Sequence, residues 1–561
     1  MDIYSDTPLD PESNQIRMLQ IQPSWRPSST IKCNLVRVDL DDLDADEVPF
    51  EFYEALSYTW GDSGNEKRIS LNGCPFQVTR NLHAALRRLR ARRLCRYLWV
   101  DALCINQKSV AERSSQVAKM SSIYKKAEQV LVWLGGEQDG SRQAIDIIDR
   151  MGDEGMEDWT PRSLARPRDL EKWRAVAKFL DRPYWRRVWI RQEVLLAPHI
   201  MILCGDKTLN WSDITAAAAI LLENQEAFDA IASMVSPHTS GYRKIGVLEG
   251  LKEIFEKQGT LELKTVVFYH RDCECTDPRD RVYGGLGLCG SDTGVVIDYA
   301  LSPAEVFINT TTVLIQSTNA LDLLSGCQES SRDLDLPSWV PNFDADWAQN
   351  KLHPNPYTVK DVAGSKLPAQ YSFDRQPGGH PVLTVKGLAV DIVAHASPPI
   401  NRDEFINDIF DVWRDFASGR AQVWATSYGV EQRRSTFLRT VIANVDFSGD
   451  RPSDQLLHDL LDRWDQHSGI EDTDTMPSFP MEDCNSNFTN RFLEVVFRRI
   501  LFVTAGGRIG VGPDALRPED LVVVIFGASV PFILRKQGGH HTLVGEACKV
   551  QEGHLKPRRK G

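Results

Sequence analysis

The sequence has few of the features that mark a metal protein or a disulfide-stabilised protein. Its eleven cysteines are scattered along the chain, and the one close pair is Cys273 and Cys275. Neither a CxxC spacing nor an HExxH motif occurs, so the sequence predicts no zinc site. An odd number of dispersed cysteines is typical of free thiols in a reducing compartment. We therefore expect neither a metal centre nor a disulfide framework.

The chain also lacks the apolar segments that membrane insertion and secretion require. No stretch approaches the roughly 18 uninterrupted apolar residues of a membrane span. The first ten residues, MDIYSDTPLD, are acidic and have no apolar centre, unlike a secretory signal. The expected location is therefore cytoplasmic, with no membrane span.

A surplus of positive charge is absent as well, since the formal net charge is −12. A general nucleic-acid binder needs a basic face that displaces counterions, so no nucleic-acid partner is expected. One local exception is a group of arginines around the end of a predicted helix: Arg87, Arg88, Arg90, Arg92, Arg93 and Arg96. We interpret this group as a solvated helix face.

The composition is that of a folded globular chain. Its 561 residues are 42% hydrophobic and 25% charged, which are ordinary fractions for globular proteins. At about 100–200 residues per domain, a chain of this length holds two to four domains.

Strands and helices alternate in the N-terminal part. Strands are expected at 33–40, 51–61, 97–100 and 129–134, a hairpin turning at Asn72-Gly73 at 68–79, and helices after the cap Asn81 and over 109–128. Residues 1–30 are polar and contain several prolines, which predicts a loose arm. Alternation of this kind predicts an α/β domain with a mainly parallel sheet flanked by helices. In such folds the loops after the strands carry function.

The pattern divides the chain into four segments. An N-terminal arm with the first strand (1–50) precedes the α/β domain (51–215), a helical region (216–335) and a mixed α+β C-terminal region (336–561). In the last region, residues 402–500 read as helical, and apolar runs at 521–526 and 531–534 predict strands. No internal repeat is evident.

Three sequence blocks resemble the HET domain of fungal heterokaryon incompatibility proteins. They are Ala55-Leu-Ser-Tyr-Thr-Trp-Gly61, Leu98-Trp-Val-Asp-Ala-Leu-Cys-Ile-Asn-Gln107 and Pro183-Tyr-Trp-Arg-Arg-Val-Trp-Ile-Arg-Gln-Glu193. Their order and spacing agree with that family over about residues 51–195. The segments Asp277–Tyr283, Leu336–Pro341 and Gly510–Pro513 resemble the extensions of such proteins, whereas the chain after Glu546 departs from their usual pattern.

This resemblance implies a role in fungal non-self recognition and regulated cell death. The HET domain would be the effector, and the extension would regulate it or sense a trigger. The implied partner is another protein, or a second copy of the chain through self-association. We hypothesise that residues 216–561 keep the HET domain silent until such a partner binds.

The HET domain is in turn similar to the Toll/interleukin-1 receptor (TIR) domain, and some TIR proteins cleave NAD+. Those proteins use a glutamate four residues after a tryptophan, a spacing shared here by Trp189 and Glu193. Glu193 is the implied catalytic residue, with Tyr58, Trp60, Asp101 and Trp189 as ligand-binding residues. Because nicotinamide leaves as a neutral ring, one carboxylate that stabilises the positive ribose centre would suffice.

Three of these residues also have a structural interpretation. Glu193 could pair with Arg186, seven residues earlier on the same predicted helical face, and Trp189 could belong to the core. Asp101 follows a predicted strand and could cap a turn through Asn106, which is the interpretation we favour for it.

The resemblance leaves three functional hypotheses open. The HET domain is an NAD+ glycohydrolase, a non-catalytic association module that signals by assembly, or an inactive paralogue. No bound cofactor is expected, and NAD+ enters only as the substrate of the first hypothesis.

Overall fold

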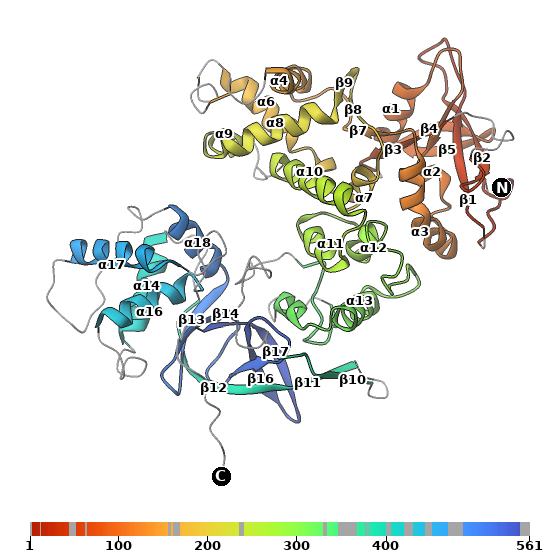
Figure 1. The fold of residues 1–561 in the computed structure, drawn as a ribbon. Coiled ribbons are helices and arrows are strands. Elements are labelled where there is room, and N and C mark those ends of the chain that lie inside the picture. Colours follow the sequence, from red (N-terminus) through yellow and green to blue (C-terminus); the bar gives the residue numbers. More distant parts are fainter. Residues whose placement is uncertain are drawn as a thin grey trace. The chain divides into compact units, whose positions relative to one another are not determined.

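The computed structural model describes residues 3–549, apart from 12, 44–51, 62–63, 155–158, 161–165, 167–168, 235–240, 329–333, 346–366, 376–378, 380, 400–405, 420–429, 444–451 and 469–485 (Figure 1). The chain forms two compact units, Met1–Pro303 and Ala304–Gly561. The first unit takes in the segments 1–50 and 51–215 together with most of the helical region 216–335. The predicted segment boundaries stay predictions of where domains begin and end.

The first unit contains a nine-stranded sheet in the order β5-β4-β2-β1-β6-β3-β7-β8-β9. Its strands are β1 (Gln15–Ile21), β2 (Lys32–Asp39), β3 (Glu54–Tyr58), β4 (Glu66–Leu71), β5 (Cys74–Thr79), β6 (Arg96–Trp99), β7 (Gln129–Trp133), β8 (Ile200–Cys204) and β9 (Lys207–Asn210). The central strands β6, β3, β7 and β8 run parallel. The prediction of a mainly parallel sheet is wrong for the rest of the sheet, which is mixed. The pair β2–β4 is parallel and β1–β6 is antiparallel. The pairs β1–β2, β4–β5 and β8–β9 are antiparallel too. Short connections join these pairs, and short connections force neighbouring strands to run antiparallel.

Two local predictions in this sheet have opposite outcomes. The hairpin between β4 and β5 turns at Asn72 and Gly73, which both adopt positive φ as a type I′ turn requires, so that prediction is confirmed. The prediction of a loose arm is wrong for Gln15–Ile21, which forms the largely buried strand β1. Arg17 interrupts the apolar pattern of β1, but its buried guanidinium is paired with Glu112 at 2.6 Å.

Helices α1 (Arg80–Leu89) and α3 (Val110–Lys126) form where the sequence predicted them. The cap of α1 is Thr79, whose hydroxyl accepts a hydrogen bond from the backbone of Leu82, so the prediction of Asn81 as the cap is wrong. Asn81 instead lies inside the first turn, and its side chain binds the carbonyl of Thr59 and the indole of Trp133.

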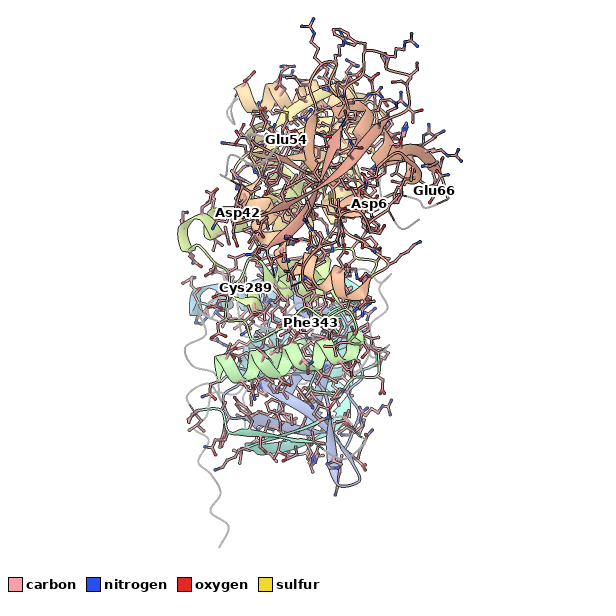
Figure 2. The ribbon with its side chains drawn as sticks, turned by 90° about the vertical axis from the view of Figure 1, so that its right-hand side faces the viewer. Asp6, Asp42, Glu54, Glu66, Cys289 and Phe343 are labelled. Carbon is pink, nitrogen blue, oxygen red and sulfur yellow. The ribbon has the colours of Figure 1, made fainter. Side chains whose placement is uncertain are left out.

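The central strand β3 is buried along its whole length, including its one charged residue. Glu54, marked in Figure 2, accepts hydrogen bonds from the guanidinium of Arg96 on β6 and the amide of Gln129 on β7. A buried carboxylate needs such partners on both sides, because an unpaired one would lose its hydration without compensation. The three parallel strands are therefore joined by side chains as well as by their backbones.

The rest of the first unit is mainly helical. It comprises α2 (Asp101–Cys104), α4 (Ser141–Glu154), α6 (Leu170–Leu180), the 3₁₀ helix η3 (Pro183–Arg186), α7 (Ile190–Leu195), α8 (Trp211–Glu223), α9 (Gln225–Ala232), α10 (Gly241–Gln258), α11 (Leu263–Tyr269), the 3₁₀ helix η4 (His270–Asp272) and α12 (Asp280–Leu286). The elements described from α9 to α12 are all helices, in agreement with the helical character predicted for residues 216–335.

The second unit mixes helices and strands, as predicted. Its helices are α13 (Pro303–Thr318), the 3₁₀ helix η5 (Asp322–Gly326), α14 (Ile406–Gly419), α16 (Val430–Val441), α17 (Asp454–Ser468) and α18 (Ser486–Val496). Strands β10 (Tyr371–Arg375) and β11 (Pro381–Val385) form a hairpin. The strands β12 (Gly387–Ala396), β13 (Arg499–Thr504), β14 (Ile509–Pro513), β15 (Leu521–Ile525), β16 (Pro531–Gln537), β17 (His540–Glu546) and β18 (Cys548–Lys549) form an antiparallel half-barrel in the order β17-β16-β15-β12-β13-β14-β18.

Two kinds of feature are absent from the described residues. None of their helices has both the length and the apolar character needed to cross a bilayer. Within the same residues, no group of three or more histidine, cysteine, aspartate or glutamate side chains is placed to hold a metal ion.

Candidate functional site

The end of the central strand β6 places Asp101 at the edge of the parallel sheet. Trp99, the last residue of β6, and Val100 after it are completely buried, and Asp101 begins the short helix α2. The predicted position of Asp101 at the carboxyl end of a buried strand is therefore confirmed. This edge is where ligands bind in α/β proteins.

Two neighbours from the end of β3 contact the Asp101 carboxylate. The indole nitrogen of Trp60 donates to Oδ2 at 2.8 Å, and the hydroxyl of Tyr58 also hydrogen-bonds this carboxylate. The other oxygen, Oδ1, accepts the backbone N–H of Ala102 at 2.7 Å. Both carboxylate oxygens are thus occupied by Trp60, Tyr58 and Ala102, so the interpretation of Asp101 as a cap through Asn106 is wrong.

Glu193 lies on α7 with its side chain enclosed. The residue is 2% exposed. One carboxylate oxygen accepts from the Ser57 hydroxyl and from Arg187 at 3.3 Å, and the other faces Arg187 at 3.5 Å. The hydroxyl oxygen of Tyr184 lies 2.7 Å from the hydroxyl oxygen of Ser57, within hydrogen-bond distance. Residues from β3, η3 and α7 therefore converge on one carboxylate.

The arginine that pairs with Glu193 is Arg187, and the predicted pairing with Arg186 is wrong. Arg186 instead lies 3.2 Å from Glu274. The prediction assumed one continuous helix from Arg186 to Glu193. The 3₁₀ helix η3 ends at Arg186, the backbone is extended at Arg187, and α7 begins only at Ile190. The break turns the next side chain, that of Arg187, towards Glu193.

Two carboxylates and one guanidinium interact in this cluster. Burial raises the pKa of Glu193 and of Asp101, and the Arg187 guanidinium counteracts both increases. The pKa of Tyr58 is raised as well, by burial and then by the negative charge of Asp101. With both carboxyl groups ionised, the cluster carries one surplus negative charge. Such perturbed groups at a strand edge are typical of functional sites, although structural networks also produce them.

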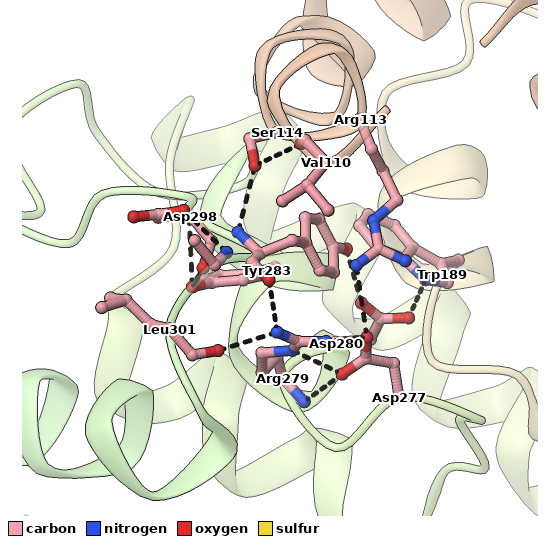
Figure 3. Close-up of polar contacts among 12 residues, drawn as sticks. Val110, Arg113, Ser114, Trp189, Asp277, Arg279, Asp280, Tyr283, Asp298 and Leu301 are labelled. Carbon is pink, nitrogen blue, oxygen red and sulfur yellow. Dashed lines mark hydrogen bonds and ion pairs between the residues drawn. The ribbon is translucent and has the colours of Figure 1, made fainter. Parts of the chain in front are cut away.

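Trp189 does not join this cluster. Its backbone carbonyl accepts the N–H of Glu193 at 3.1 Å, so the predicted helical spacing is present. Its indole nitrogen, however, donates to Asp280 of α12 at 3.0 Å (Figure 3). The structure therefore brings Tyr58, Trp60, Asp101 and Glu193 together around Arg187 and directs Trp189 elsewhere.

The segment that contains Asp280, the hydrogen-bond partner of Trp189, also contacts helices α3 and α7. We call residues 270–301 the clasp. Asp280 accepts a second hydrogen bond from Tyr299 at 2.6 Å, and the Arg113 guanidinium of α3 lies 3.7 Å from the Tyr299 ring centroid (Figure 3). Burial raises the pKa of Asp280 to about 6. Arg113 also approaches Asp277 to 3.8 Å.

Further contacts run from the clasp to the chain around α7. The backbone N–H of Val188 donates to the carbonyl of Glu274 at 3.0 Å, and Arg191 lies 3.3 Å from Asp272. The sequence motif Asp277–Tyr283 was identified only as a family resemblance. Nothing in it predicts a partner for Asp280, since Trp189 lies 91 residues away.

The accessible part of the cluster is small and aromatic. Trp60 is 45% exposed, whereas Tyr58 and Glu193 are each 2% exposed. A flat ring could stack on the Trp60 indole next to the Asp101 carboxylate. Contact with Glu193 would require its enclosure to open, because the residue is 2% exposed.

Two regions of the chain match known protein families. Residues 53–193 match the family "Heterokaryon incompatibility protein (HET)". Residues 458–558 match the "Het-6 beta-barrel domain", which includes the strands β13 to β18 of the half-barrel.

One characterised relative is similar over nearly its full length. Heterokaryon incompatibility protein 6, OR allele, of Neurospora crassa is 24% identical over a 667-residue alignment that covers 98% of this chain and 96% of that protein. No solved structure matches the chain.

Proposed function

Because the chain carries a HET domain and a Het-6 beta-barrel domain, we propose that it is an effector of fungal non-self recognition that triggers regulated cell death. The order of the two domains and the nearly full-length similarity to an incompatibility protein support this proposal. The effector would be the HET domain, and the half-barrel unit would regulate it. The protein partner, or self-association, implied by the family resemblance belongs to the same proposal.

The proposed chemistry is cleavage of NAD+ between nicotinamide and ribose. One observation carries it: Glu193 and Asp101 interact with the single guanidinium of Arg187, so the cluster has a surplus negative charge when both carboxyl groups are ionised. Nicotinamide leaves as a neutral ring while positive charge develops at the ribose. A preorganised negative charge in a buried site would stabilise that transition state.

Each residue would have a distinct part in this reaction. Glu193 would contact the ribose after its enclosure opens, and Arg187 would hold the carboxylate in position. The Trp60 ring would stack on a flat base, with Tyr58 beneath it. The TIR-like fold of the HET domain is part of this proposal and is supported by the parallel strands β6, β3, β7 and β8.

A second candidate is a non-catalytic association module. The enclosure of Glu193 favours it, because both of its oxygens already have partners. In this case the cluster would be a rigid support for the exposed Trp60, and signalling would proceed by assembly.

Measurement of NAD+ and viability in a fungal host that expresses the full chain separates the two candidates. Glu193→Gln keeps the shape of the side chain and removes its charge, so we expect NAD+ loss to disappear while the protein level stays unchanged. Glu274→Gln, at a carboxylate whose side chain is 62% exposed, is the matched control and should behave as the parent. NAD+ loss that persists in a folded Glu193→Gln variant would exclude Glu193 as the catalytic group. Cell death without NAD+ loss in the parent would favour assembly.

A further inference from the structure

Two segments of this acidic chain contain no acidic residue at all. Residues 13–38 hold four lysines and arginines, and residues 67–100 hold nine. Since the whole chain has a net charge of −12, the remaining residues carry −25. Glu66, marked in Figure 2, is the last acidic residue before the second segment. Positive charge is therefore concentrated in two short parts of the sequence.

The fold brings these two parts together. Residues 13–38 form β1 and all of β2 except Asp39, and residues 67–100 form most of β4 together with β5, α1 and β6. These strands are neighbours in the sheet order β5-β4-β2-β1-β6. The two acid-free segments thus make up one half of the sheet.

Two loops of this half are fixed side by side. We call residues 23–30 and 90–95 the loop pair. The backbone of Ser24 donates to the carbonyl of Ala91 at 3.1 Å. The guanidinium of Arg90 donates to the carbonyls of Arg26 and Pro27 at 3.0 and 2.9 Å. Part of the arginine group at 87–96 therefore has a structural role, which the interpretation as a solvated helix face does not include.

The loop pair presents apolar side chains among arginines. Trp25 is 62% exposed and Leu94 is 76% exposed. The guanidinium of Arg93 lies 5.1 Å from the Trp25 ring centroid, and Arg92 beside it is exposed. Neither Arg92 nor Arg93 forms a salt bridge within the part of the chain that the structure describes. Their charges are therefore available to an external partner.

We propose that the loop pair docks onto the surface of a bilayer that contains anionic phospholipids. The contact is peripheral: Trp25 and Leu94 enter the boundary between headgroups and acyl chains, while Arg92 and Arg93 bind the headgroups. Tryptophan favours this boundary, and basic residues next to inserted apolar side chains strengthen such binding. The proposal rests on the loop pair alone and does not depend on the proposed function.

Leu94 distinguishes a bilayer from the other anionic partners. A single-stranded nucleic acid would use an arginine–tryptophan surface through stacking on flat rings. Leu94 has no flat ring, yet it is the more exposed of the two apolar side chains. An acidic peptide would require the arginines only. Transfer of an exposed leucine side chain from water into hydrocarbon is favourable. The exposed pair of Trp25 and Leu94 therefore favours a lipid partner.

Sedimentation of the full chain with vesicles tests the proposal. We expect binding to vesicles of phosphatidylcholine with phosphatidylserine, weaker binding as salt increases, and little binding to phosphatidylcholine alone. The double variant Arg92→Gln/Arg93→Gln should bind roughly 30-fold more weakly, since each arginine near an anionic surface contributes about a factor of five. Leu94→Ser should reduce binding about 10-fold.

Matched variants elsewhere in the first unit control for surface changes. Val296→Ser, at a residue that is 78% exposed, and Arg166→Gln/Lys257→Gln should leave vesicle binding unchanged. Circular dichroism confirms that each variant is folded. The proposal is overturned if the full chain does not bind phosphatidylserine vesicles, or if folded loop-pair variants bind as the parent does. Capture of single-stranded RNA without vesicle binding would assign the surface to nucleic acid and also overturn the proposal.

Discussion

The positive charge of Arg187 lies close to two carboxylates. Its removal should therefore lower the free energy of unfolding more than removal of Arg186 does. Arg187→Ala would leave Glu193 buried without its counter-charge, and the loss of one partner of a buried pair costs about 3–5 kcal/mol. The free energy of unfolding, measured in urea, should fall by this amount. Arg186→Ala is the control, since its partner Glu274 is largely exposed and such pairs contribute about 0–1 kcal/mol. Equal losses in the two variants would contradict the central role of Arg187.

Asp280 should make the stability of the clasp depend on pH. Its pKa is raised from 3.8 to about 6 in the folded chain, so the folded state binds the proton more tightly than the unfolded state. Its favourable contribution is complete below pH 3.8 and is lost as the pH rises through about 6. The loss at neutral pH is roughly 3 kcal/mol, because one pKa unit corresponds to about 1.4 kcal/mol.

The variant Asp280→Asn tests this dependence, because asparagine cannot ionise. Urea unfolding should show a smaller decrease in stability between acidic and neutral pH for Asp280→Asn than for the parent. Asp206→Asn, at an exposed position, should keep the parental pH dependence. A parental pH dependence in Asp280→Asn would show that other groups are responsible.

At the residue scale, the sequence predicted the neighbours of the candidate site better than their pairing. Asp101 was predicted at the end of a strand, whereas Tyr58 and Trp60 were implied by the family resemblance. The three meet because the parallel strands β3 and β6 end at the same edge of the sheet. The partner of Glu193 could not be predicted, because a 3₁₀ helix and an extended residue interrupt the expected helical face. The direction of the Trp189 side chain depends on Asp280, which is remote in sequence.

At the scale of elements, the close packing of α12 on α11 and η4 predicts an intolerant glycine. A β-carbon at Gly285 would lie 2.0 Å from Val266 and 2.7 Å from the ring of His270. Gly285→Ala should therefore lower the free energy of unfolding by about 1–3 kcal/mol or more, as overpacking does. Gly250→Ala in α10 is the control, since nothing lies within 4 Å of its added β-carbon. There alanine should stabilise the helix by up to about 1 kcal/mol. Thermal or urea unfolding of both variants measures the difference, and a neutral Gly285→Ala would contradict this packing.

The elements that the sequence predicted are those with clear local signals. Apolar runs marked β3, β6 and β7, and Asn72-Gly73 marked the hairpin. Strand β1 was missed because Arg17 breaks its apolar pattern, and the strand depends on a partner, Glu112, from a distant helix. The local sequence pattern cannot show that a residue distant in sequence neutralises a buried charge in a strand.

At the scale of the molecule, the position of a truncation should decide whether the HET domain folds. A chain that ends near residue 215 lacks the clasp, so Trp189 and Arg191 lose their partners and the fragment should be poorly soluble. A chain that ends at residue 303 keeps the first compact unit intact. Expression of both fragments, with soluble protein measured by sedimentation, checks this expectation. A soluble and folded 1–215 fragment would contradict it.

The longer fragment also tests whether the rest of the chain keeps the HET domain silent. We expect residues 1–303 to be more toxic to a fungal host than the full chain at equal abundance. A tethered inhibitor acts at high effective concentration, so even a weak restraint suffices. Growth and protein level must be measured together. A soluble, well-expressed 1–303 fragment that is no more toxic than the full chain would refute autoinhibition by residues 304–561.

The clasp has a consequence for recombination between related genes. Its contacts join the chain around α7 to residues 270–301, so a crossover placed between these two regions would unite halves from different parents. Such a hybrid would fold only where both parents share compatible residues at Trp189, Arg191, Asp272 and Asp280. Crossovers near residue 303 would exchange the first compact unit as one piece and keep every one of these contacts. The clasp therefore determines which exchanges of sequence between alleles yield a folded protein, and by that route which hybrid alleles persist.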